Sequence, residues 1–141
     1  MSKIDNPFGT ALEAFGDYIG STFRVCIPAR ITKYDKKNHT ADVQPLIKDN
    51  SGDNPGIIQD VLVAKSVYMI DEIWEKMDDY ISGDKIKITP PKKLIKVGTE
   101  VTVVFCDYSI DHYTPGDGKI VSRGSDDRQH NVNDGIIVAL M

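Results

Sequence analysis

The chain has 141 residues, of which 40% are hydrophobic and 27% are charged, and its formal net charge at pH 7 is −4. This composition is typical of a single folded globular domain and excludes a largely disordered chain. The negative net charge also argues against a dedicated nucleic-acid-binding protein, because such proteins usually carry a basic surface.

Targeting and redox signals are few in this sequence. The N-terminus lacks the charged and apolar regions of a signal peptide, and no apolar run approaches the ~20 residues of a membrane helix. The two cysteines, Cys26 and Cys106, stand too far apart to form a zinc knuckle. We expect both to be reduced and buried, with a disulfide across a sheet as the alternative in an oxidising compartment.

Residues 8–20 carry large apolar side chains spaced four, three and four residues apart, which indicates one face of a helix. These side chains are Phe8, Leu12, Phe15 and Ile19. Gly9, Gly16 and Gly20 weaken such a helix by about 1 kcal/mol each relative to alanine, and a helix this short does not stand alone in water. We therefore expect an N-terminal helical arm, residues 1–21, that lies on this domain or on a neighbouring copy.

Two runs after the arm alternate between apolar and polar residues with the period of two that indicates a β-strand. The first covers residues 23–32, the second covers residues 41–45, and a polar turn at 35–40 joins them into a hairpin. Pro28 and Pro45 cannot donate to a sheet ladder, so they mark strand edges or bulges. Edges and bulges suit a small closed barrel whose strands bend sharply.

The rest of the chain supplies the remaining strands. Residues 57–70 indicate a third strand or a bulged pair, and Val101, Val103 and Phe105 alternate in a further strand. Residues 69–95 form an irregular insertion, in which we favour a short helix around 71–80 over an extended excursion.

The chain finishes on an apolar stretch that we expect to be the closing strand of the sheet. If it alternates regularly, Ile136, Val138 and Leu140 face inward, and the remaining three face outward. The expected outward residues are Ile137, Ala139 and Met141. Just before the strand, His130, Asp134 and Gly135 are expected to shape a sharp turn, with Gly135 permitting a positive φ.

Five short, strongly bent strands in a chain of this length predict an all-β fold. The expected architecture is a small five-stranded barrel of the oligonucleotide/oligosaccharide-binding (OB) type, with a short N-terminal helix and the 69–95 insertion. The barrel domain is expected to span residues 22–141, as a single domain overall.

Residues that carry chemistry do not gather into a recognisable active site. Ser109, Asp111 and His112 have the composition of a catalytic triad, but within four residues of one loop they cannot adopt its geometry. His39 and His130, like His112, have no partner at metal-ligand spacing. We therefore expect no enzyme, no metal, no cofactor and no small-molecule substrate.

A basic stretch leaves one alternative open. Five lysines between 85 and 96 follow Trp74 and Tyr80, and on an OB barrel such a set can track phosphates while aromatic rings stack bases. The alternative function is therefore a single-stranded nucleic-acid-binding protein. The acidic net charge favours a solvated charged surface, so we consider nucleic acid an unlikely partner.

Three segments together resemble the OB-fold N-terminal domain of phage tail spike and baseplate hub proteins, over residues 22–68 and 96–137. The first is "RVCIPARITKYDKKNHTADVQPLI", with Pro28-Ala29-Arg30-Ile31 and Val43-Gln44-Pro45. The second is "KVGTEVTVVFCDYSIDHY", matched at Gly98, Val101, Val103, Phe105 and Asp111. The third is "RQHNVNDGIIV", matched at Arg128, His130, Asp134 and Ile136. Residues 69–95 have no counterpart in the pattern.

The resemblance implies a structural protein of the virion, made in the host bacterial cytoplasm and assembled at the end of the tail tube. Such a module is a homotrimer on the tail axis and acts as a plug or adaptor for penetration of the cell envelope, meeting a membrane only indirectly. Relatives continue into a β-helical needle, whereas this sequence ends at Met141. We therefore expect a separate needle or tip protein as a partner, beside tail hub and baseplate proteins.

The surfaces expected to make these contacts follow from the elements above. The subunit or partner interface is predicted at the arm and the chain end: Phe8, Leu12, Phe15, Ile19, Ile137, Ala139 and Met141. The insertion is predicted to grip a neighbouring baseplate protein through Trp74, Tyr80, Lys92 and Lys93.

Overall fold

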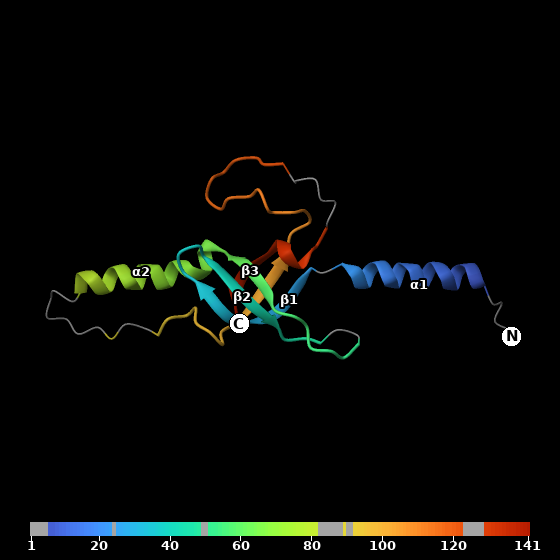
Figure 1. Cartoon of the computed structure of the whole chain (residues 1–141), viewed down its shortest axis with the longest axis horizontal. Helices are drawn as coiled ribbons and strands as arrows, with labels where there is room; N and C mark the ends of the chain where they lie inside the picture. Colours follow the sequence, from blue (N-terminus) through green and yellow to red (C-terminus); the bar gives the residue numbers. More distant parts are fainter. Residues whose placement is uncertain (1–5, 24, 49–50, 82–88, 90–91, 123–128) are drawn as a thin grey trace.

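The computed structural model describes the chain except for residues 1–5, 24, 49–50, 82–88, 90–91 and 123–128. Within the described part, five strands form a closed barrel, and two α-helices project from it to opposite sides (Figure 1). The strands are β1 (Cys26–Asp35), β2 (Thr40–Pro45), β3 (Ile58–Val63), β4 (Glu100–Phe105) and β5 (Gly135–Leu140). The helices are α1 (Pro7–Thr22), α2 (Lys65–Ile81) and the short 3-10 helix η1 (Val132–Asp134).

The barrel closes in the order β1-β2-β3-β5-β4, with β4 pairing back onto β1. All neighbouring strands are antiparallel except β3 and β5, which run parallel. The helix α2 fills the connection between β3 and β4. This arrangement confirms the predicted all-β, OB-like barrel.

The core lies inside the barrel and draws on every strand, with alternate residues pointing inward except where register shifts interrupt the alternation in β3 and β5. Its buried members from β1 to β3 are Ala29, Ile31, Ala41, Val43, Ile58, Val61 and Val63, and those from β4 and β5 are Val101, Val103, Phe105 and Ile137. Val67 of α2 and Ile95 of the segment before β4 are buried in the same core. The predicted inward set of β4, with its period of two, is confirmed.

The start of β1 differs from the prediction. The strand begins at Cys26, and Phe23 and Val25 before it are exposed rather than part of the buried alternation. Cys26 is likewise exposed, so the expectation that both cysteines are buried is wrong for it; Cys106 is half-buried, and both are free thiols. The alternation of apolar and polar residues in the sequence therefore begins before the strand that forms the barrel wall.

The prediction that Ile137 faces outward is wrong, because its side chain has no exposed surface in the core. Gly135 and Ile137 face inward opposite Phe105 and Val103, and the register of β5 against β4 then shifts by one residue. Val138 has no partner in this ladder and is exposed, so the inward face changes parity at that bulge. Leu140 consequently packs against the core as expected.

The expected irregular insertion contains a regular element. The helix α2 occupies residues 65–81, so the favoured helix around 71–80 is confirmed and begins earlier than predicted. The third strand is correspondingly shorter than the 57–70 run, since it ends at Val63. Most of the remaining insertion, residues 82–88 and 90–91, lies outside the described residues.

The first helix begins where local capping chemistry places it. The Asn6 side chain accepts a hydrogen bond from the Gly9 amide at 3.2 Å, and Pro7 occupies the first turn, where its missing N–H costs nothing. The helix then runs away from the barrel as a separate rod, seen in blue on the right of Figure 1. None of the α1 side chains that the structure describes is buried.

Candidate assembly interface

The predicted interface residues of the arm form one exposed stripe along α1. Phe8 is 73% exposed and Phe15 is 61% exposed, and Leu12 and Ile19 complete the same face. Exposed aromatic and aliphatic side chains in a row are costly in water, so this stripe has the character of a contact surface.

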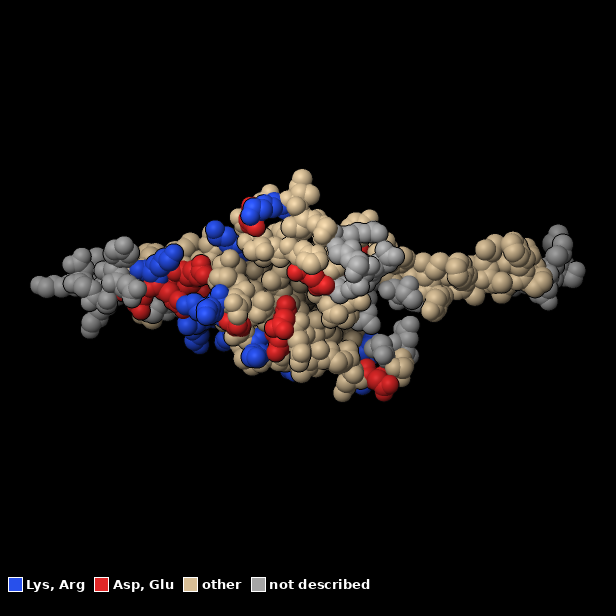
Figure 2. All heavy atoms as spheres, turned by 45° about the horizontal axis from the view of Figure 1, so that its top comes forward, with Lys and Arg blue, Asp and Glu red and all other residues tan. Residues whose placement is uncertain are grey.

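The charged residues of α1 lie away from this stripe. Glu13 and Asp17 are the two charged residues of the helix, and the 3.6-residue period places both on the opposite side. In the view of Figure 2 the rod at the right is almost free of charged atoms, whereas lysine, arginine and acidic side chains gather over α2 at the left. The molecule therefore has an apolar pole and a charged pole.

A second surface that exposes apolar side chains lies at the end of the barrel from which α1 departs. A groove of about 820 Å³ runs between the start of β1, the end of β2, the start of β3 and η1. We call it the barrel-end groove. Its apolar lining consists of Cys26, Ile27, Pro28, Pro45, Ile47, Pro55, Ile57, Ile58 and Val132, and Lys48, Asn54, Gln59 and Asn133 make the rest of the lining polar. Ile47 and Ile57 are 65% and 53% exposed, so the groove presents large apolar side chains to solvent.

The charged pole is built by α2, which is held to the barrel by polar contacts. The ring of Tyr68 stacks on that of His39, with the centroids 3.7 Å apart, and His39 Nε2 lies 3.4 Å from a carboxylate oxygen of Glu72. The two carboxylate oxygens of Asp71 accept the backbone amides of Leu94 and Ile95, both at 2.9 Å. The helix is thus tied to the β1–β2 turn on one side and to the segment before β4 on the other.

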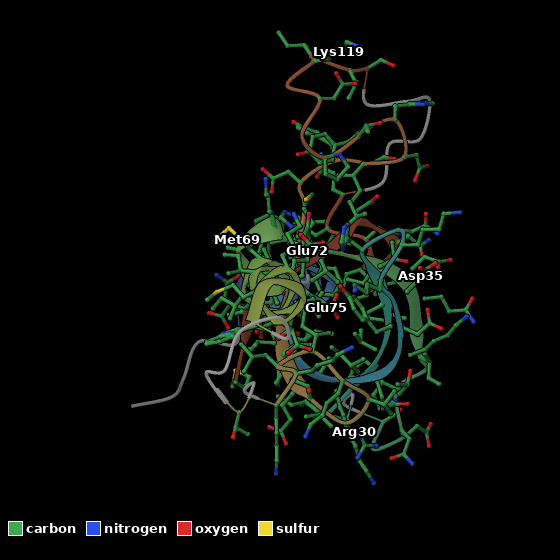
Figure 3. The ribbon with its side chains drawn as sticks, turned by 90° about the vertical axis from the view of Figure 1, so that its left-hand side faces the viewer. Arg30, Asp35, Met69, Glu72, Glu75 and Lys119 are labelled. Carbon is green, nitrogen blue, oxygen red and sulfur yellow. The ribbon has the colours of Figure 1, made fainter. Side chains whose placement is uncertain are left out.

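Ion pairs add to this attachment. Glu75 pairs with Lys36 of the β1–β2 turn and with Lys93, the latter at 3.1 Å, and these lysines lower the pKa of the Glu75 carboxyl. In Figure 3, which looks along α2, Glu72 and Glu75 point toward the side of the barrel on which Asp35 lies, and Met69 points away. One face of α2 therefore serves the barrel, and the other is left for contact.

The pKa of Tyr34, which lies beside this face of α2, is shifted. Burial, followed by the carboxylates of Glu72 and Asp71, raises the pKa of Tyr34 above its ordinary value. At the turn itself, hydrogen bonds from the Asn38 side chain and from backbone amides lower the pKa of Asp35. The pKa shifts of Tyr34 and Asp35 therefore reflect the burial and the polar contacts at the β1–β2 turn, to which α2 is attached.

The predicted partner-gripping residues divide between described and undescribed positions. Trp74, Lys92 and Lys93 line one hollow of about 280 Å³ between α2 and the segment before β4, with Ile70 and Leu94 in its apolar wall. Tyr80 lies in the last turn of α2, and its side chain is outside the described part. The structure therefore brings three of the four together.

The same hollow is a poor track for phosphates. Its rim carries Asp71, Glu75 and Asp78 beside the two lysines, and Lys93 is already paired with Glu75. Lysines 85 and 87 lie outside the described residues. Since acidic side chains repel a phosphate backbone, this surface does not favour the nucleic-acid alternative.

The predicted turn residues lie together at the entry to β5. His130 has a positive φ of 47°, its ring meets that of Phe23 edge to face, and its Nε2 lies 3.4 Å from a carboxylate oxygen of Asp107. Asp134 is fully buried and accepts the backbone amide of Ile110 at 3.1 Å. Asp134 thereby fastens the loop after β4 to the closing strand, a long-range contact that the local turn pattern did not reveal.

Gly135 has a different role from the predicted one. Its φ is −84°, an ordinary value for any residue, so the expectation of a positive φ at Gly135 is wrong. A Cβ built at this position would stand 3.0 Å from Val103 Cγ1, 3.3 Å from the Phe105 ring and 3.4 Å from Val61 Cγ1. Close packing of the core, rather than backbone conformation, therefore favours glycine at this position.

The end of the chain leaves two of its predicted contact residues on the surface. Ala139 and Met141 are exposed, Met141 at 73%. The Met141 amide donates to the Glu100 carbonyl at 3.0 Å, which holds the chain end along β4. Ile137 is not part of the candidate interface, because its side chain is buried in the core.

Other kinds of site were also sought in the described part of the chain. There, no three His, Cys, Asp or Glu side chains gather into a group able to hold a metal ion. No helix among the described residues is both long and apolar enough to cross a membrane. Ser109, Asp111 and His112 all lie in the loop between β4 and η1, as their sequence spacing requires.

The strand order, the parallel β3–β5 pair and the helix between β3 and β4 define a small barrel domain of the OB type. The family model described as "Phage protein Gp138 N-terminal domain" matches residues 27–139, and the chain belongs to this family. A comparison with curated proteins found no significant match. The resemblance to a phage N-terminal domain that the three sequence segments indicated is thus confirmed.

Proposed function

We propose that the chain is a structural component of a phage or phage-like tail. In this proposal it is a homotrimeric OB module at the end of the tail tube, where it serves as a plug or adaptor during penetration of the cell envelope. The observation that carries the proposal is the apolar stripe of α1, which is exposed in the single chain and is a surface suited to a protein partner.

Family membership supports the setting of this proposal. A phage protein domain favours a structural role in the virion over an enzymatic one. Closed cyclic symmetry is the usual way in which identical subunits cover each other's apolar surfaces. The resemblance of the sequence to tail spike and hub modules implies that this symmetry is three-fold.

The charged pole is assigned to a different partner. The exposed face of α2 carries Ile73 and Met77 beside the Trp74 hollow, with lysines and acids around its rim. An apolar patch with a charged rim is typical of a contact that forms with one specific protein. We assign it to a tail hub or baseplate protein, gripped by Trp74, Tyr80, Lys92 and Lys93.

Light scattering behind size exclusion, at two protein concentrations, tests the trimer. We expect a mass close to three times 15.7 kDa that does not change with dilution. Phe15→Asp places a charge in the stripe and should lower the mass to that of one chain, whereas Asp17→Asn, on the opposite side of the same helix, should leave it unchanged. A wild-type chain that runs as a monomer at both concentrations would contradict the proposal.

A further inference from the structure

We propose that the barrel-end groove receives the α1 arm of a second copy of this chain. Three such exchanges, each copy giving its arm to the next, then close the trimer. This inference rests on the proposed trimer and adds to it the surface that α1 occupies and the direction in which the arms pass.

The groove and the arm are two surfaces of the same chain that expose large apolar side chains. The groove presents Ile47 and Ile57 to solvent at its mouth, with Pro28 and Pro45 in its wall. The arm presents Leu12 and Phe15 on one exposed stripe. Each surface is one that water disfavours, and each has the chemistry to cover the other.

A bundle of three arms fits the sequence of α1 less well. A coiled coil requires a heptad pattern sustained over roughly three to four heptads, with charged residues beside the seam. The 16 residues of α1 hold little more than two heptads. Gly9 and Gly16 flank its stripe where a coiled coil would carry charged side chains. A short helix with small flanking residues is better suited to lie in a groove.

Charge permits the same arrangement. Lys48 is the one charged residue among the described residues that line the groove. Glu13 and Asp17, the two charged residues of α1, lie on the side opposite the stripe, so they stay in solvent when the stripe is covered.

The path of the chain determines which copy supplies the arm. Only residues 23–25 separate the end of α1 from Cys26, the first residue of β1 and part of the groove lining. The arm leaves that end of the barrel pointing outward, as Figure 1 shows. An outward arm reaches a neighbour without any change in its own chain, and a head-to-tail contact of this kind closes into a ring when the rotation is three-fold.

The exposed thiol of Cys26 provides a direct test. Full-length chains carrying Leu12→Cys or Phe15→Cys are oxidised mildly and run on a non-reducing gel. We expect disulfides between the new thiol of one chain and Cys26 of the next, which link the chains into covalent dimers and closed trimers. Each bond requires the two Cβ atoms to come within about 4.5 Å, so it reports direct contact.

Three controls assign the bond. Adding Cys26→Ser to either variant should abolish the crosslink, and Asp17→Cys, on the far side of the arm, should not form it. Cys106 contributes little background, because burial and the carboxylates of Asp134 and Asp107 raise the pKa of its thiol. Cys26 of the wild-type trimer should also resist alkylation and become reactive in Phe15→Asp.

The outcomes separate the two proposals. A trimer by light scattering whose crosslinks persist after Cys26→Ser has its arms bundled together, which overturns the groove assignment and leaves the trimer. An Asp17→Cys crosslink, a disulfide within one chain, or a trimer with no crosslink and a freely alkylated Cys26 also overturns it. A monomeric wild-type chain overturns the proposed function itself.

Discussion

Gly135 shows how a single residue is determined by its neighbours. It begins β5 at the point where Val103, Phe105 and Val61 converge, and a methyl group beside its Cα would require these side chains to shift. Its backbone conformation is one that any residue adopts. The constraint is therefore one of packing density, in a core that has no free volume at that point.

Gly135→Ala is accordingly expected to lower the free energy of unfolding by about 1–3 kcal/mol, because the core must shift to admit the methyl group. Chemical denaturation followed by circular dichroism measures this. The matched control is Gly20→Ala in α1, where an added Cβ meets nothing within 4 Å. That change should leave the barrel's unfolding midpoint unaltered. Equal stability of the two variants would show that the core yields at Gly135 without cost.

Individual residues of β4 and β5 also show where the sequence pattern predicts the structure and where it does not. The alternation in β4 was predictable, because Val101, Val103 and Phe105 sit in an unbroken strand. The parity of β5 was not, since the bulge at Val138 arises from the register against β4 and leaves no trace in a uniformly apolar stretch. Gly135 was misread for a similar reason, because close packing between distant strands has no local signal.

At the scale of elements, α2 is the part of the fold whose attachment is mainly polar. Only Val67 of its described residues is buried in the core, and much of the remaining contact runs through Tyr68, Asp71, Glu72 and Glu75. A helix attached in this way depends on specific hydrogen bonds more than on buried area. Asp71 is central, because it accepts two backbone amides that precede β4.

Asp71→Asn is expected to release one of those amides, since an amide side chain has one acceptor oxygen in place of two. We expect a loss of about 1–2 kcal/mol in unfolding free energy and faster hydrogen exchange at Leu94 and Ile95. The pKa of Tyr34 should also fall, because the Asp71 carboxylate contributes to raising it. Ultraviolet titration of the phenol measures this shift.

Asp78→Asn on the same helix is the control for this prediction. Asp78 is exposed, and its substitution should change stability by less than about 0.5 kcal/mol. If the two variants lose the same stability, or if exchange at Leu94 and Ile95 is unchanged in Asp71→Asn, the hydrogen bonds to the Asp71 carboxylate are not what holds α2 to the barrel.

The helices and strands that could be predicted are those whose signals lie within a short stretch of sequence. The spacing of apolar residues marked α1 and the middle of α2, and capping by Asn6 accounts for where α1 begins. The first turns of α2 follow directly from β3, and there the apolar run "VLVAKSVYMI" is compatible with either structure. Contact of Val67 with the core decides in favour of the helix, and that contact exists only once the barrel has formed.

At the scale of the whole molecule, the two projecting helices give the chain two different poles. The α1 arm and the barrel-end groove expose large apolar side chains, whereas α2 and the segment before β4 carry interleaved acids and lysines (Figure 2). We expect self-association through the first pole and contact with another tail protein through the second. Such a division lets one small barrel hold its copies together and its partner at the same time.

This polarity predicts how the chain responds to salt. Burial of apolar surface is not weakened by screening, so the trimer mass should stay constant from about 50 mM to about 500 mM sodium chloride.

The charge of the chain also predicts that it does not bind single-stranded DNA. Fluorescence anisotropy of a labelled oligo-dT should show no binding, even at low salt, because the net charge is −4 and Lys93 is paired with Glu75. The variant Lys92→Glu, Lys93→Glu is the control, since it should leave the signal unchanged. Affinity that falls steeply with salt, and that this variant abolishes, would instead establish the α2 pole as a single-strand binding surface.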